Sequence, residues 1–171
     1  DHHLSHTLSG LYYKNKIPAV SVVIDGFGDD SSSTIHHIKS SNEIIKLWSS
    51  KFPHSLGLFY SAITDYLGFA VNEGEYKVMG LAAYGKPIHY DKLIETINFQ
   101  NGDLHLDTDY YDFVRSIQRS YSFKLRELFG VNERSGNSKL EMNTPEFQSY
   151  ADIAASAQKV VEENLNKIFK Y

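Results

Sequence analysis

Residues 19–49, AVSVVIDGFGDDSSSTIHHIKSSNEIIKLWS, alternate between β-branched or apolar runs and short polar segments. The runs predict three strands, which cover residues 19–25, 31–38 and 43–49. Glycine and aspartate dominate the first link, residues 26–30, and Ser40-Ser41-Asn42 form the second. Because both links are short, we expect an antiparallel three-stranded unit with residues 26–30 at its tip.

A helical pattern precedes the strands, over residues 2–14. Its apolar residues recur at the spacing of one helix face: Leu4, Leu8, Leu11 and Tyr12. Asn15 and Pro18 follow and end the helix. We therefore expect this stripe to join the core.

The pattern after residue 54 is mainly helical. Cap signals predict helices that begin at Ser55, at the Asn72–Glu75 capping pair and at Thr144-Pro145. The first should end at Gly68 and the second before Gly85 and Pro87. The last should place one apolar face in the core: Ile153, Ala157, Val160, Val161, Leu165 and Ile168. A further short helix is indicated by the spacing of Tyr90, Leu93, Ile94 and Ile97.

Four shorter segments complete the pattern. Asn101-Gly102, between NFQ and DLHL, predicts a small hairpin near residues 98–106. Helices are predicted over residues 109–119 and 122–129, and a polar loop over 131–143. The fold class is thus α/β, with antiparallel strands at 19–49 followed by mostly helices.

The domain organisation predicted is one fragment, residues 1–171. Residues 1–54 hold a helix plus the three-strand unit, and residues 55–171 are mainly helical. The chain starts without Met, and its last helical pattern continues to Tyr171. We therefore expect a piece of a longer protein.

Composition excludes several classes of protein. Hydrophobic residues make up 42% of the chain and charged residues 22%, which argues against disorder. The net charge of −4 provides no electrostatic footprint for nucleic acid or an anionic membrane. The sequence has no cysteine, and none of its apolar runs is long enough to span a bilayer. We expect a cytoplasmic protein.

Three histidines, His2, His3 and His6, lie at the start of the first predicted helix. His6 and His3 are about 40° and 100° around the helix axis from His2, away from the apolar stripe. Two histidines at i and i+4 can place their nitrogens on one divalent ion. The HExxH glutamate of zinc proteases is missing. The alternative is a solvated, histidine-rich helix start.

The link IDGFGDD combines glycines with carboxylates. Gly26 and Gly28 allow close approach of the backbone to a ligand, and successive N–H groups there could form an anion nest. Asp25, at the strand end, could hold a metal ion or a bound water, and Asp29 lies in the same loop. The alternative is an ordinary hairpin turn, since the segment is neither a GxGxxG nor a Walker loop.

The helix start in GEYKVMGLAAYG is a second candidate anion site. Glu75 and Lys77 lie in its first turn, where N–H groups can meet an anion. Gly74 and Gly80 interrupt the helix, each at a cost of about 1 kcal/mol relative to alanine. Close helix packing is the alternative explanation for these glycines.

The order of four strings is distinctive: DHHLSH, IDGFGDD, HSLGLFYSAITDYLGF and GEYKVMGLAAYGKP. In this order they resemble the O-carbamoyltransferase family of nodulation-factor and antibiotic biosynthesis, strongly over residues 1–87. The resemblance continues weakly to YADIAASAQKVVEENL in the last helix. Two departures leave the expected ligands intact: Thr7 stands where the family usually has alanine, and Ala83 where it has proline.

The resemblance implies a ribonuclease-H-like lobe of the actin and sugar-kinase superfamily, similar to the enzyme that transfers threonylcarbamoyl to tRNA. It also implies a reaction. Carbamoyl phosphate and ATP give carbamoyl-adenylate in a second domain, and the carbamoyl group then passes to a hydroxyl of a small-molecule acceptor.

The resemblance also assigns site residues. It implies a divalent metal, Fe²⁺ in characterised members, held by His2, His6 and a downstream aspartate. His3 is expected near the phosphate or carbamoyl group as a catalytic residue, and the IDGFGDD loop is expected to face phosphate. Of the aspartates considered as the third ligand, none is a credible replacement: Asp29, Asp30 and Asp65. The ligand is therefore expected beyond Tyr171.

Several expectations concern this chain by itself. Without its other domains we expect weak or no metal binding, no catalysis, and exposed apolar surface that favours self-association. Two rival readings remain. One is a nucleotide-binding module of the sugar-kinase and actin type without carbamoyl transfer; the other is a structural subdomain whose histidines are solvated.

Overall fold

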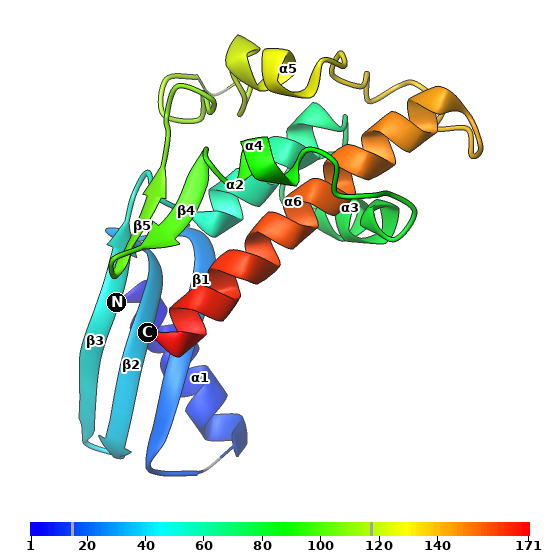
Figure 1. Ribbon diagram of the computed structural model, residues 1–171. Coiled ribbons are helices and arrows are strands. Elements are labelled where there is room, and N and C mark those ends of the chain that lie inside the picture. Colours follow the sequence, from blue (N-terminus) through cyan, green and yellow to red (C-terminus); the bar gives the residue numbers. More distant parts are fainter. Residues whose placement is uncertain (15, 117) are drawn as a thin grey trace. The chain divides into compact units, whose positions relative to one another are not determined.

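The computed structural model describes residues 1–14, 16–116 and 118–171. The chain divides into two compact units, Asp1–Leu58 and Phe59–Tyr171, and each contains its own antiparallel sheet. The elements follow one another along the chain (Figure 1) as α1 (His2–Lys14), β1 (Ala19–Gly28), β2 (Ser31–Ser40), β3 (Glu43–Lys51), α2 (Leu56–Tyr66), α3 (Glu75–Ala82), α4 (Tyr90–Leu93), β4 (Ile97–Gln100), β5 (Asp103–Leu106), α5 (Phe123–Phe129) and α6 (Pro145–Lys170).

The first unit contains the predicted sheet, with strand order β1-β2-β3 and antiparallel pairing throughout. The strands are longer than expected, because β1 continues through Gly28 and pairs it with Ser31. The predicted loop over residues 26–30 thus shrinks to a two-residue turn, Asp29-Asp30. Asp29 has a φ of 55°, a left-handed conformation that aspartate tolerates better than most residues. The register of β1 on β2 shifts between Ile24 and Gly28.

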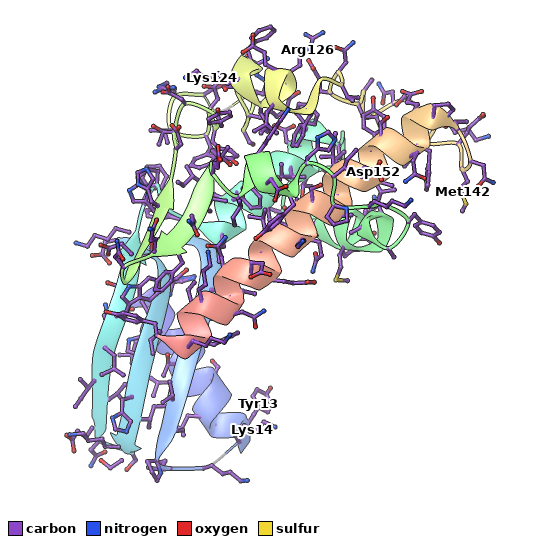
Figure 2. The ribbon with its side chains drawn as sticks, viewed as in Figure 1. Tyr13, Lys14, Lys124, Arg126, Met142 and Asp152 are labelled. Carbon is purple, nitrogen blue, oxygen red and sulfur yellow. The ribbon has the colours of Figure 1, made fainter. Side chains whose placement is uncertain are left out.

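Helix α1 forms as predicted, but the face that it buries is not the predicted apolar stripe. The buried residues are His3 and Thr7, whereas Leu8 is 45% exposed and Tyr12 84% exposed. Tyr13, at the C-terminal end of the helix (Figure 2), is 85% exposed. Leu4 and Leu11 are half-buried, so the prediction that the stripe joins the core was wrong for Leu8 and Tyr12.

The reason lies in the surface of the sheet beneath α1, which is polar. The hydroxyl of Ser21 donates to Thr7 Oγ1 over 3.1 Å, and Thr7 Oγ1 lies 3.2 Å from His36 Nδ1. Thr34 Oγ1 lies 3.3 Å from His3 Nδ1. Because buried polar groups need partners, α1 turns its polar face toward the sheet.

In the second unit, α6 contributes many of the buried residues of the core. Its buried residues include Ile153, Ala157, Val160 and Ile168, as the periodicity predicts, whereas Val161 and Leu165 of the predicted face are only half-buried. Thr144 caps the start of the helix by accepting from the Phe147 N–H.

The segment after α3 runs close against α6. A Cβ added to Gly85 would lie 1.9 Å from the carbonyl oxygen of Ala151, so only glycine fits there. The Asp152 carboxylate, on the face of α6 shown in Figure 2, accepts from the Lys86 N–H over 2.7 Å. Close packing thus explains Gly85, the glycine of the LAAYG string.

Several local signals are confirmed. Ser55 Oγ accepts from the Leu58 N–H at the start of α2, and Gly68 follows its end with a φ of 68°. Asn101 and Gly102 both have positive φ in the β4–β5 turn. Helix α5 is capped by Ser122 and ended by a left-handed Gly130.

Two helix predictions need correction. Residues 109–116 and 118–119 form turns rather than the helix predicted over 109–119. The segment folds back on itself instead, with Asp112 N–H donating to Ser120 O and Ser122 N–H to Tyr110 O. The buried Tyr111 hydroxyl, 2.5 Å from Thr96 Oγ1, anchors this fold. The short helix near Tyr90 ends at Leu93, because Ile97 enters β4.

Within the described residues, no helix is both long enough and apolar enough to cross a membrane.

Replacing Asn164 with leucine should destabilise the protein by about 2 kcal/mol or more, because buried backbone groups lose their partners. The fully buried Asn164 amide joins α6 to β4: its oxygen accepts from the Phe99 N–H, and its nitrogen donates to Ile97 O. Urea unfolding of the two proteins measures the difference. Equal midpoints would show that this connection contributes no stability.

Stability should also fall at acidic pH through His36. Burial lowers the pKa of His36, and the charges of Lys46 and His3 act in the same direction. Because the pKa is lower in the folded than in the unfolded protein, the unfolded state binds protons more readily as the pH falls through about 6.5. The free energy of unfolding should therefore drop more between pH 7.5 and 5.5 in the wild type than in His36→Asn. Parallel pH profiles would contradict this assignment.

Candidate metal centre

Two imidazoles and one carboxylate converge in the first unit. His2 Nε2 lies 2.6 Å from Asp25 Oδ2, and His6 Nε2 lies 3.4 Å from the same oxygen. The two Nε2 atoms are 3.1 Å apart. Among the described residues, this is the one group of three or more potential ligands whose donor atoms all lie within 4.8 Å of one another.

The local structure explains this convergence. His2 and His6 are one helical turn apart on α1, so their rings lie on one face, with centroids 4.7 Å apart. Ser21 and Asp25 share the face of β1 beneath α1, because side chains alternate along a strand. The Ser21 contact with Thr7 marks that face. Docking of the helix thus carries both histidines to the carboxylate.

The carboxylate of Asp25 is held in its ionised form. Burial opposes ionisation, but the hydrogen bonds from His2 and the Gly26 N–H and the electrostatic influence of His2 and His6 keep the pKa of Asp25 below its ordinary value. The side chains of His2, His6 and Asp25 are 41%, 53% and 34% exposed, so the group is reachable from solvent. An ionised carboxylate beside two imidazoles can bind a divalent cation.

The main chain behind Asp25 is also braced. Ser55 Oγ donates to the carbonyl oxygens of Asp25, over 3.1 Å, and Gly26, over 2.7 Å. A Cβ on Gly57 would lie 2.5 Å from Asp25 O, so the start of α2 can approach this closely only with glycine. The HSLG string therefore supports the strand end that carries the carboxylate.

The sequence placed Asp25 at a strand end, where it could hold a metal ion or a bound water, but the third ligand of the histidine pair was expected beyond Tyr171. The structure instead brings a third ligand-type group, Asp25, to the histidine pair from within the chain. The signal for it was the two-residue spacing of Ser21, Val23 and Asp25, which puts all three side chains on one face of the strand. That signal identifies a ligand only when one knows which face α1 covers.

His3 is not part of this group. It is 1% exposed; its Nε2 lies 2.9 Å from the carbonyl oxygen of Ser31, and its Nδ1 3.3 Å from Thr34 Oγ1. Because a carbonyl oxygen only accepts, the ring donates from Nε2. Both nitrogens are engaged inside the protein, so His3 helps to fix α1 on the sheet. The catalytic role expected for His3 stays a prediction.

The glycine-rich link packs against α1. Asp29 Oδ2 accepts from the His2 N–H over 2.7 Å, and the Gly28 backbone lies directly against the His2 ring. Gly26 is less constrained, because a Cβ there would meet only Leu58, at 3.8 Å.

Glu75 and Lys77 belong to the second unit, Phe59–Tyr171. Glu75 accepts from the Ser61 hydroxyl and from the N–H groups of Asn72 and Gly74. Burial opposes ionisation here too, but these hydrogen bonds keep the pKa of Glu75 below its ordinary value. Glu75 therefore serves the predicted capping pair. Lys77 Nζ lies over the Phe69 ring, 5.9 Å from its centroid.

The sequence matches the family described as carbamoyltransferase N-terminus over residues 1–170. It is similar to an uncharacterized protein of Synechocystis, with 36% identity over 165 residues that cover 95% of this chain and 26% of that protein. It is also similar to nodulation protein NolNO of Sinorhizobium fredii, with 30% identity over 174 residues, or 99% of this chain and 22% of NolNO. Nodulation protein NolO of Bradyrhizobium diazoefficiens is 31% identical over 166 residues, which cover 95% of this chain and 26% of NolO.

The chain therefore spans about a quarter of the length of these relatives. The family match, in contrast, covers nearly every residue of the chain, including the helix, the sheet and the long C-terminal helix. On this evidence the chain belongs to the carbamoyltransferase N-terminus family.

Proposed function

We propose that this chain is the metal-holding part of an O-carbamoyltransferase. The observation that carries the proposal is the meeting of His2 Nε2, His6 Nε2 and Asp25 Oδ2 within one small volume. Family membership supports carbamoyl transfer as the general reaction. The donor set supports a metal centre, because two imidazoles with one carboxylate form a common site for Fe²⁺ and are also suited to Zn²⁺.

The proposed reaction moves a carbamoyl group from carbamoyl phosphate to a hydroxyl of a small-molecule acceptor, through carbamoyl-adenylate made with ATP. Water first releases phosphate from carbamoyl phosphate, and the carbamate that forms displaces pyrophosphate from ATP. In the transfer step, the bond from the carbamoyl carbon to the phosphate oxygen breaks and a bond to the acceptor oxygen forms. AMP leaves with the proton that the acceptor hydroxyl loses. A divalent cation, when bound, supplies a Lewis acid that polarises the carbonyl and neutralises the phosphate.

The chain's own residues have defined parts in this proposal. His2 and His6 offer neutral nitrogens from one helix face, and Asp25 offers a negative oxygen from the strand opposite. The carboxylate balances part of the charge of the cation. Adenylate formation belongs to other parts of the longer protein, and we place the chain in a ribonuclease-H-like lobe of the actin and sugar-kinase type.

The metal-free protein should bind one Co²⁺ per chain. His6→Ala and Asp25→Ala should each abolish stoichiometric binding, because each removes one of three ligands. Co²⁺ titration followed by visible absorption, together with metal analysis after gel filtration, measures this directly. The exposed His105 on β5 provides the matched control, since His105→Ala should bind like the wild type. Equal stoichiometry in the wild type and His6→Ala would rule out the site.

A second measurement separates carbamoyl transfer from simple nucleotide binding. AMP should bind at least about tenfold more tightly to Co²⁺-loaded than to metal-free protein, because the cation offsets the phosphate charge. In His6→Ala, addition of Co²⁺ should leave AMP affinity unchanged. Calorimetry of AMP binding gives both values. AMP affinity that is indifferent to Co²⁺ in the wild type would favour a nucleotide-binding module without transfer chemistry.

A further inference from the structure

The turn between β1 and β2 lies against the first metal ligand. A Cβ added to Gly28 would lie 2.1 Å from His2 Cδ2 and 2.4 Å from His2 Cγ. Real side chains do not approach this closely, so the His2 ring occupies the space that any other residue at position 28 would fill. The backbone of Gly28 is itself held in place, because it pairs with Ser31 in the sheet.

The next residue holds the same histidine by its main chain. Asp29 Oδ2 accepts from the His2 N–H over 2.7 Å. This N–H is one of the donors at the start of α1 that have no partner within the helix, and a carboxylate is favourable at that position. Asp1 serves another of these donors, the N–H of Leu4. Asp29 differs from Asp1 because it comes from the hairpin, 27 residues away in sequence.

We propose that Gly28 and Asp29 are positioning residues for the metal centre, an inference that rests on the metal site proposed above. Gly28 sets where the ring of His2 lies, and Asp29 sets where its backbone lies. The same hairpin carries Asp25 three residues earlier. One short segment, residues 25–29, therefore supplies one ligand and orients another, and so sets the separation between them.

In this role the GFGDD link differs from the phosphate-facing loop that the sequence predicts. The space where a Cβ of residue 28 would lie is occupied by the imidazole ring of His2. The Asp29 carboxylate is directed to the helix rather than toward a ligand. The glycine and the aspartate thus serve the geometry of the metal centre.

Gly28→Ala should weaken Co²⁺ binding by about ten- to hundredfold, the usual effect of disturbing a group that orients a ligand. Gly10 on α1 provides the matched control, because a Cβ there meets nothing within 4 Å. Gly10→Ala should bind Co²⁺ like the wild type. Co²⁺ affinity in Gly28→Ala within twofold of Gly10→Ala would overturn the role of Gly28.

Asp29 is tested by a pair of variants that both tolerate its left-handed backbone. Asp29→Asn keeps an oxygen acceptor and should bind Co²⁺ within about threefold of the wild type, whereas Asp29→Gly removes the acceptor and should lose about tenfold. The neighbouring exposed carboxylate is the control, and Asp30→Gly should leave Co²⁺ affinity unchanged. Equal losses in Asp29→Gly and Asp30→Gly would overturn the role of Asp29. This series keeps the proposal testable even where Gly28→Ala does not fold.

Nuclear Overhauser contacts between the His2 and His6 rings provide a readout without metal. They should be present in the wild type and in Gly10→Ala, and lost in Gly28→Ala and Asp29→Gly. Failure of the wild type to bind Co²⁺ would overturn the metal site, while these contacts would still test positioning. Ring contacts that persist in Gly28→Ala and Asp29→Gly would overturn the positioning role, whatever the metal affinity.

Discussion

The polar docking of α1 on the β1–β2–β3 sheet is the constraint on which the candidate site depends. His3 reaches the Ser31 carbonyl and the Thr34 hydroxyl, and Thr7 reaches Ser21 and His36. Apolar contacts are largely non-directional, whereas each buried polar group that loses its partner costs about 1–3 kcal/mol. A polar interface therefore permits few orientations of the helix. His2 and His6 can meet Asp25 only when this orientation is kept.

Buried polar side chains have a similar role in the second unit. Asn164 joins α6 to β4, and the Asp152 carboxylate accepts a hydrogen bond from the Lys86 N–H, in the segment after α3. Arg134 donates from its guanidinium to the carbonyl oxygens of Leu67 and Gly68, just beyond the C-terminal end of α2. Each joins elements far apart in sequence. Both units thus use directed hydrogen bonds to set the geometry between elements that apolar packing alone would leave adjustable.

Local signals were sufficient to predict most elements. Strand runs, the Asn101-Gly102 turn, the Ser55 and Thr144 caps and the period of α6 depend on neighbours in sequence, and all are confirmed. The helix predicted over residues 109–119 was wrong, because the conformation of this segment depends on the burial of Tyr111. A local sequence pattern does not contain that contact.

The site was predictable only in part, for the same reason. The i, i+4 spacing of His2 and His6 indicated a shared face from sequence alone. Predicting Asp25 as the third group required knowledge of which face of α1 contacts the sheet. The apolar stripe of α1 indicated a different face from the one that does. A stripe of leucines is a strong signal for burial, but here Thr34, His36 and Ser21 make the opposing surface polar. The roles of Gly28 and Asp29 follow from that docking as well.

The most direct test of this account is the coordination shell of the bound ion. X-ray absorption spectroscopy of the Co²⁺-loaded protein should show the scattering of two imidazole rings, together with oxygen ligands that include a carboxylate. His6→Ala, loaded at high Co²⁺ concentration, should show one imidazole at most. A shell of oxygen atoms without imidazole scattering in the wild type would contradict the assignment of His2, His6 and Asp25 as a metal centre.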